Sequence, residues 1–220
     1  MNDEFEPIIK ILEGYIDCCG HREHATARYE RFMAGTYYQS RQNLDRYHLW
    51  NGHVMSSFWG LYQQYLSKTT GWRASIASYP LELLIEQLTN PYKTLMKEKI
   101  KKSSRAFLEF AELYCSPGNF LVFPTDKMRK PFMWAAFSRI DWFLYECFAG
   151  GSFGNFFKHD NKKLRRWITE QNLDAVFKHG IIRKNQINWF VDSTEPIYKW
   201  GSQDILTYVE RATELIKFRS

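Results

Sequence analysis

The sequence predicts a mainly α-helical fold at the margin of α+β, and three observations support this prediction. Apolar residues recur at helical spacing through most of the 220 residues. A short stretch near 120–124 has strand character, and the helix expected at 131–148 is apolar nearly all round. A chain of this length builds one core, so we expect 1–220 to form a single globular domain whose one or two strands pack on that central helix.

Helical periodicity is the clearest signal along the chain, and it stops at glycine or starts at proline. Gly20 follows the first helical stretch and Gly35 follows the second. Pro80 suits the first turn of a helix, where its missing N–H donor is not needed. Core-facing apolar spacing predicts helices at residues 3–19, 21–34, 58–66, 80–88, 92–114, 162–171 and 202–219.

Residues 36–60 have no single clear period. Asn51-Gly52 is a strong turn dipeptide, and the aromatic residues around it suit either two short strands or a helix broken at the turn. Periodicity leaves both alternatives open. Beyond the helix at 58–66, we expect residues 67–71 to form a loop.

The stretch from 116 to 148 is the structural centre of the prediction. A turn at Pro117-Gly118-Asn119 leads into the strand, a short basic turn follows, and the apolar helix at 131–148 comes next. Buried charges are paired or functional, so we expect a buried charge network from the three charged residues that interrupt this helix, Arg139, Asp141 and Glu146. The two acids are five positions apart and do not share one helix face, which favours internal pairing over paired-carboxylate catalysis.

The charge balance favours an anionic partner. The chain has 30 Lys and Arg against 24 Asp and Glu, a formal net charge of +6 and a pI near 9.0. Nucleic acid, a nucleotide or an acidic protein surface fits this balance. The densest basic runs, at 97–102 and 162–166, also fit ordinary solvated helix faces. As candidates for contact with phosphate or nucleic acid we take Lys162, Lys163, Arg165 and Arg166.

Composition and cysteine usage predict a soluble protein of the cytoplasm with no membrane partner. Hydrophobic residues make up 45% of the chain, and no apolar run approaches the roughly 20 residues that span a bilayer. The four cysteines do not form a secreted disulfide framework, and the N-terminus lacks an apolar signal segment. Four possible soft-metal ligands cluster in Cys18-Cys19-Gly20-His21-Arg22-Glu23-His24, but no second cluster has zinc-site spacing, so we predict no metal and no cofactor.

The candidate catalytic residues are Arg46, His48 and His53. Their spacing resembles the active-site motif of HEPN-type ribonucleases, in which an arginine stabilises phosphate charge and a histidine moves a proton during attack by the RNA 2′-hydroxyl. The Asn51-Gly52 turn falls inside the motif, where that family has a continuous helix. The alternative is a polar loop in which His48 bonds to neighbouring backbone groups.

Four segments together resemble a bacterial family of no established activity. They are Tyr47-His48-Leu49-Trp50-Asn51-Gly52, Gly118 to Val122-Phe123-Pro124, Leu144-Tyr145-Glu146-Cys147, and Tyr208 with Glu214-Leu215-Ile216-Lys217-Phe218-Arg219. The chain departs from that family's Asp-Arg pair before the acidic helix, where it reads Arg139-Ile140-Asp141. The resemblance implies a bacterial or mobile-element origin and transfers no catalytic residue.

Two functional hypotheses follow. The first is a protein that acts on or binds nucleic acid, such as an RNase-like effector, with chemistry at the Arg46 to His53 segment and phosphate contacts at 162–166. The second is a non-catalytic protein-interaction module, such as a regulator or a component of phage defence or counter-defence. In that case exposed aromatic residues would grip another protein, with Trp50, Trp59 and Trp72 as examples.

Overall fold

The computed structural model describes residues 4–18, 52–70, 80–90, 105–122, 139–150, 153–193, 195 and 197–220. Helices dominate this part of the chain, so the predicted mainly α fold is confirmed. The α-helices are α1 (Glu6–Cys18), α4 (Phe58–Thr70), α5 (Pro80–Thr89), α7 (Arg105–Leu113), α9 (Ile140–Ala149), α10 (Asn161–Glu170) and α11 (Ser202–Arg219). The strands are β1 (Gly52–Val54) and β2 (Phe120–Val122). Short 3₁₀ turns are η1 (Pro117–Asn119), η3 (Gly154–Phe157), η4 (Asp174–Val176), η5 (Lys178–Gly180), η6 (Lys184–Gln186) and η7 (Ile197–Lys199).

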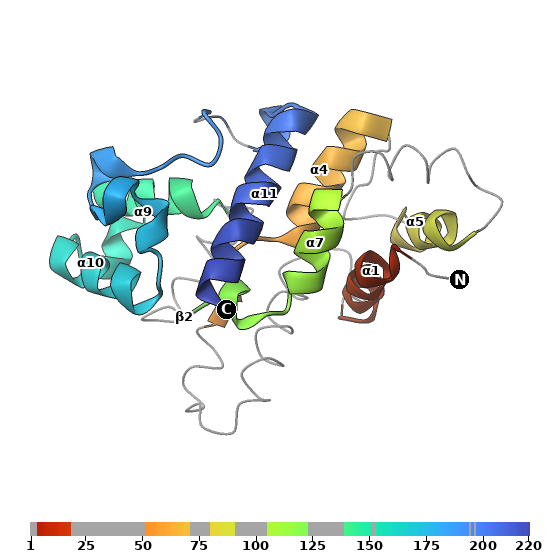
Figure 1. The fold of residues 1–220 in the computed structure, drawn as a ribbon, viewed down its shortest axis with the longest axis horizontal. Coiled ribbons are helices and arrows are strands. Elements are labelled where there is room, and N and C mark those ends of the chain that lie inside the picture. The colour runs from red at the N-terminus through yellow and green to blue at the C-terminus, as the bar shows by residue number, and fades with distance from the viewer. Residues whose placement is uncertain are drawn as a thin grey trace, which may run out of the picture.

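Helix α11 runs between two groups of elements (Figure 1). On one side α4 and α7 pack against it, and α1 packs in turn on α7 and α5. On the other side α9 and α10 lie together, joined through η3. One cluster of buried apolar side chains includes residues from each of these helices, so the described segments share a continuous core.

Local signals explain where several helices begin and end. The helix predicted at 3–19 is present as α1, and α5 begins at Pro80 as expected. Asp160 caps α10 because its side chain accepts hydrogen bonds from the backbone N–H groups of Lys162 and Lys163, donors that have no partner inside the helix. Gly150, with φ of 80°, ends α9 in the left-handed conformation that glycine adopts without strain. The helix predicted at 202–219 spans the same residues as α11.

The loop predicted at residues 67–71 is wrong over 67–70, where α4 continues to Thr70. Two threonines end this extension. The hydroxyls of Thr69 and Thr70 donate to the carbonyls of Tyr65 and Leu66, one turn back, at 2.9 and 2.7 Å. Their hydroxyls find hydrogen-bond acceptors within the helix. Because these residues are polar, they do not continue the apolar spacing by which a helix is predicted from sequence.

Strands β1 and β2 pair antiparallel, with Gly52 opposite Val122 and Val54 opposite Phe120. Of the two short strands in one alternative for this region, the strand after Asn51 is present at residues 52–54, and the residues before it lie outside the described part of the chain. The strand predicted at 120–124 is present over Phe120–Val122, and residues 123 and 124 lie outside the described part of the chain.

Helix α9 supplies the C-terminal part of the helix predicted at 131–148, and the prediction is wrong at Arg139, which is not helical. It begins at Ile140, because Arg139 before it has extended backbone angles (φ −88°, ψ 91°), and residues 131–138 lie outside the described part. No side chain from Ile140 to Phe148 is fully exposed, in keeping with a central helix. The helices expected at 21–34 and over 92–104 also lie outside the described residues.

Aromatic side chains fill the interface between α4 and α7. Phe58 and Tyr62 of α4 meet Phe107 of α7 with ring centroids 5.9 and 5.1 Å apart, a spacing typical of favourable aromatic pairs. Trp59 is only 1% exposed, so its predicted role on an exposed binding surface is wrong. Trp50 and Trp72 lie outside the described residues. Most of the aromatic side chains in the described part of the chain therefore lie in the core.

Within the described ranges, none of the helices combines the length and the apolar character that crossing a bilayer requires.

Candidate functional site

The structure places one of the three candidate catalytic residues. His53 lies in β1, opposite Leu121 of β2. Arg46 and His48 lie outside the described residues. His53 thus occupies a strand, whereas the ribonuclease motif that it resembles lies in a helix.

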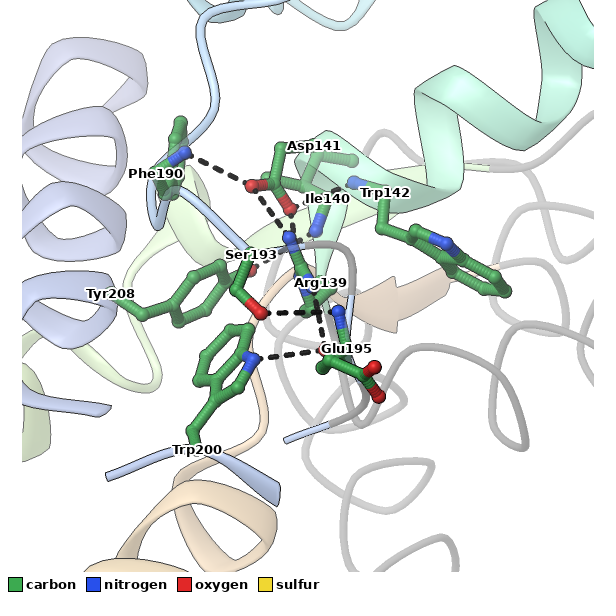
Figure 2. A network of polar contacts seen from close by, with 9 residues as sticks. All are labelled: Arg139, Ile140, Asp141, Trp142, Phe190, Ser193, Glu195, Trp200 and Tyr208. Carbon is green, nitrogen blue, oxygen red and sulfur yellow. Dashed lines mark hydrogen bonds and ion pairs between the residues drawn. The ribbon is translucent and has the colours of Figure 1, made fainter. Parts of the chain in front are cut away.

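The buried charges just before and inside α9 form a compact network (Figure 2). The Arg139 side chain is 4% exposed and that of Asp141 is fully buried. Arg139 Nε donates to Asp141 Oδ1 at 3.2 Å, and Nη2 donates to Oδ2 at 3.3 Å, so the two side chains meet in a bidentate pair. The extended backbone at Arg139 lets its side chain turn toward a residue only two positions ahead, which a helical backbone does not allow.

Both members of this pair also hold backbone groups. Asp141 accepts hydrogen bonds from the backbone N–H groups of Phe190, at 3.0 Å, and Trp142, at 2.7 Å. Arg139 donates to the carbonyl of Glu195 at 3.1 Å, and its guanidinium carbon lies 4.6 Å from the ring centre of Trp200. The network therefore connects Phe190, Glu195 and Trp200 to the start of α9.

Tyr208 of α11 closes the same network. Its hydroxyl accepts a hydrogen bond from the backbone N–H of Ile140 at 3.0 Å. Burial raises the pKa of the Tyr208 hydroxyl well above its ordinary value, and the nearby Asp141 carboxylate raises it further. Tyr208 is therefore a neutral partner that ties α11 to α9.

This network is closed to a ligand. Its two charges are buried and satisfied by each other and by backbone groups, the arrangement expected of a structural ion pair. Glu146, the third residue of the predicted network, is only half-buried and takes no part in the contacts drawn in Figure 2.

Arg219, near the chain end, makes a second structural contact that sequence reasoning missed. It donates to the carbonyls of Gly118, Phe120 and Gln171, the last two at 2.8 Å. It thus joins the end of α11 to β2 and to the end of α10, and in Figure 1 the C-terminus lies beside β2. An arginine near a chain end carries no pattern that would reveal these partners, since all three lie about 50 or 100 positions away.

The predicted phosphate-binding residues share the outward face of α10. Leu164, Trp167 and Ile168 are buried, and the side opposite them is exposed. Trp167 also fixes this orientation, because its Nε1 donates to the carbonyl of Val122 in β2 at 2.8 Å. The four cations are all exposed: Lys162, Lys163, Arg165 and Arg166.

Carboxylates neutralise little of this face. Arg166 pairs with Glu170 at 2.7 Å, and it is the one of these four cations that has a carboxylate partner within the described ranges. The surrounding segment, 153–193, has eight Lys and Arg against four Asp and Glu, so this fifth of the chain carries most of the net charge of +6. α10 lies at the outer end of its group in Figure 1.

Metal binding and cysteine chemistry have little support in the described part of the chain. It contains no group of three or more His, Cys, Asp and Glu placed to hold a metal ion, while residues 19–24 of the Cys/His cluster lie outside it. Cys115 and Cys147 are free, and burial raises the pKa of the Cys147 thiol well above its ordinary value. A thiol held neutral in this way is an inert core side chain.

Comparisons of the chain with protein-family models, with curated proteins and with solved structures give no match. The resemblances to the ribonuclease motif and to the bacterial family therefore stay predictions.

Proposed function

We propose that the protein binds nucleic acid through the basic face of α10, by contacts to the phosphate backbone. The observation that carries the proposal is that Lys162, Lys163 and Arg165 are all exposed on the solvent side of α10 and have no carboxylate partner among the described residues. Lysine and arginine that neutralise phosphates release condensed counterions, which drives binding without any reading of base sequence.

The alternative, a protein-interaction module, has less support. The large apolar side chains that are exposed in the described part of the chain are Ile181, Tyr198 and Phe218, which lie after η5, in η7 and in α11. Protein interfaces are typically built on a contiguous apolar patch with aromatic anchors. The basic face of α10 favours a polyanion instead.

A matched pair of triple variants tests the proposal. Lys162→Gln/Lys163→Gln/Arg165→Gln removes the three unpaired cations from α10. The control Lys10→Gln/Lys68→Gln/Lys199→Gln removes three exposed lysines from other elements and changes the net charge equally. Binding of fluorescently labelled RNA and DNA, single- and double-stranded, is measured by anisotropy between 50 and 300 mM salt, concentrations chosen because phosphate contacts weaken steeply over this range.

The α10 variant should lose affinity by about 100-fold at 0.1 M salt, since each phosphate contact contributes about 0.7 to the slope of log K against log salt. The slope of log K against log salt should become less steep by about 2 in the α10 variant, whereas the control should keep the wild-type slope. Equal affinity and equal slope for the two variants would remove the proposal.

We further propose, as the RNase-like form of this function, that Arg46, His48 and His53 cleave the bound RNA. The test is degradation of end-labelled RNA by the wild type and by a His48→Ala/His53→Ala variant. If the RNA stays intact in both reactions, the proposed cleavage is rejected, and the proposed binding through α10 is unaffected.

A further inference from the structure

A groove lies between α11 and the segment that follows α10. It encloses about 310 Å³ and is open to solvent along one side. That volume is at the lower end of the range for small-ligand sites, about 300–1,000 Å³, and suits one planar group better than a large ligand. The groove shares Phe190 with the buried network and holds none of the predicted site residues.

One wall is a single face of α11. Thr207, Arg211, Glu214 and Phe218 line the groove at spacings of four, three and four residues, which places them in one row along the helix. The row is about 16 Å long at 1.5 Å per residue. It combines a hydroxyl, a cation, an anion and an aromatic ring, and the ring of Phe218 is 66% exposed.

The opposite wall contributes Asn188 and the half-buried Trp189. Trp189 is held in place from behind, because its ring lies 5.4 Å from that of Tyr145 and 5.7 Å from the guanidinium of Arg139. An aromatic side chain that is fixed on one side and borders an open groove on another is a preorganised stacking surface.

The polar pair in the groove is complementary to a base edge. Arg211 Nη1 lies 3.4 Å from Glu214 Oε2, and both side chains are more than half exposed, so the pair is weakly held. It presents a donor and an acceptor side by side, the arrangement found along the hydrogen-bonding edge of a nucleobase. Phe218 and Trp189 add aromatic faces, on which any base stacks.

We propose that this groove binds a nucleobase of a single-stranded nucleic acid, with Phe218 or Trp189 stacking on the base and the Arg211–Glu214 pair contacting its edge. The inference rests on the proposed function and narrows it. α10 supplies phosphate contacts, and the groove selects single strands, because a base inside a duplex is stacked on both faces and its Watson–Crick edge is already paired.

The test uses exposed residues, so that the variants fold. Phe218→Ala and Arg211→Gln/Glu214→Gln alter the groove, and Tyr198→Ala is the matched control, since it removes another aromatic ring that is 59% exposed. Anisotropy with labelled single-stranded and duplex oligonucleotides gives affinity and salt slope. NMR spectra of ¹⁵N-labelled protein titrated with single nucleoside monophosphates report whether the groove itself is occupied.

We expect Phe218→Ala to weaken single-strand binding about tenfold or more, the loss typical of one stacking aromatic, with an unchanged salt slope and little effect on duplex binding. Arg211→Gln/Glu214→Gln should remove the response to nucleoside monophosphates, and Tyr198→Ala should behave as wild type. If the α10 variant shows a smaller salt dependence of affinity but the groove variants bind like wild type, the base site in the groove is overturned and the proposed binding through α10 is supported. If no oligonucleotide binds but nucleoside monophosphates still shift resonances of the groove residues alone, the proposed function is overturned and the base site is supported. Nucleotides that shift no groove resonance would overturn the base site.

Discussion

Replacing Asp141 by asparagine tests the buried pair most directly. Asparagine keeps the size of the side chain and one carbonyl oxygen, so it continues to accept from one of the two backbone N–H groups that Asp141 holds. It removes the negative charge, which leaves Arg139, with a side chain 4% exposed, without its counter-ion. The variant therefore removes the charge of the pair together with the acceptor for one backbone N–H.

The expected loss of unfolding free energy is about 3–5 kcal/mol, the range for breaking a buried ion pair by removing one partner. Typical domains have 5–15 kcal/mol in total, so the variant should be close to unfolding at 37 °C. An Arg139→Met/Asp141→Asn double variant should lose clearly less than the sum of the two single variants, because it leaves neither charge stranded.

Urea unfolding followed by circular dichroism measures these differences. With a slope of about 3 kcal/mol per molar urea, the midpoint for Asp141→Asn should fall by about 1–1.7 M. Arg166→Gln is the control. Its pair with Glu170 is shorter, 2.7 Å against 3.2 Å, but the two side chains are 81% and 52% exposed. Solvent screens such a pair, so its loss should cost about 0.5 kcal/mol or less.

A loss below about 1 kcal/mol for Asp141→Asn, or a double variant whose loss equals the sum of the single losses, would refute this reasoning. Either result would mean that the two charges do not stabilise each other in the folded protein.

Three further predictions concern single side chains. Tyr208→Phe should lose about 1–3 kcal/mol at pH 7, because the first backbone N–H of α9 loses its acceptor. The raised pKa of Tyr208 means that the folded state holds the hydroxyl proton more tightly than the unfolded state. The unfolding free energy of the wild type should therefore fall as pH rises above about 10, and it should fall less steeply in Tyr208→Phe. Urea titrations from pH 8 to 11 measure this, and an equal dependence of unfolding free energy on pH in the two proteins would contradict it. Gly118→Ala should lower the melting temperature by at least several degrees, because the new Cβ would lie 2.0 Å from the backbone oxygen of Ile216. Gly201→Ala is the control and should melt within a degree or two of wild type, because its new Cβ would lie 3.5 Å from Asp204 Oδ2, an ordinary contact distance. Removing Cys147 by substitution with alanine should leave thiol labelling of the native protein at pH 8 unchanged and reduce labelling in urea by one thiol; a drop in native labelling would show that this thiol is reactive.

Most helices followed from the sequence because their signals are local. Apolar residues three and four positions apart define a face, and a capping residue or a proline defines an end, so α1, α5, α10 and α11 lie close to their predicted positions. The exposure of the cations on α10 follows from the same periodicity, which turns Leu164, Trp167 and Ile168 inward.

Contacts between segments that are distant in the sequence leave no local pattern from which they could be predicted. The pairing of β1 with β2 joins residues about 70 positions apart, and the periodicity around Asn51-Gly52 had left strands and a broken helix equally open. The Arg139–Asp141 pair was expected from the cost of burying charge, but the extended backbone that lets residues two positions apart meet was not.

The sequence alone was enough to show that this protein is mainly helical, that its central helix is apolar, and that Lys162, Lys163, Arg165 and Arg166 lie together on one helix. These properties depend on residues within a few positions of one another. Only the tertiary structure decided that Arg219 holds β2 and α10, that Trp59 is buried, and that α11 and the 188–190 segment enclose a groove. Each of these depends on which surfaces meet when the core forms, and that is fixed by the packing of the whole chain rather than by any short stretch of it.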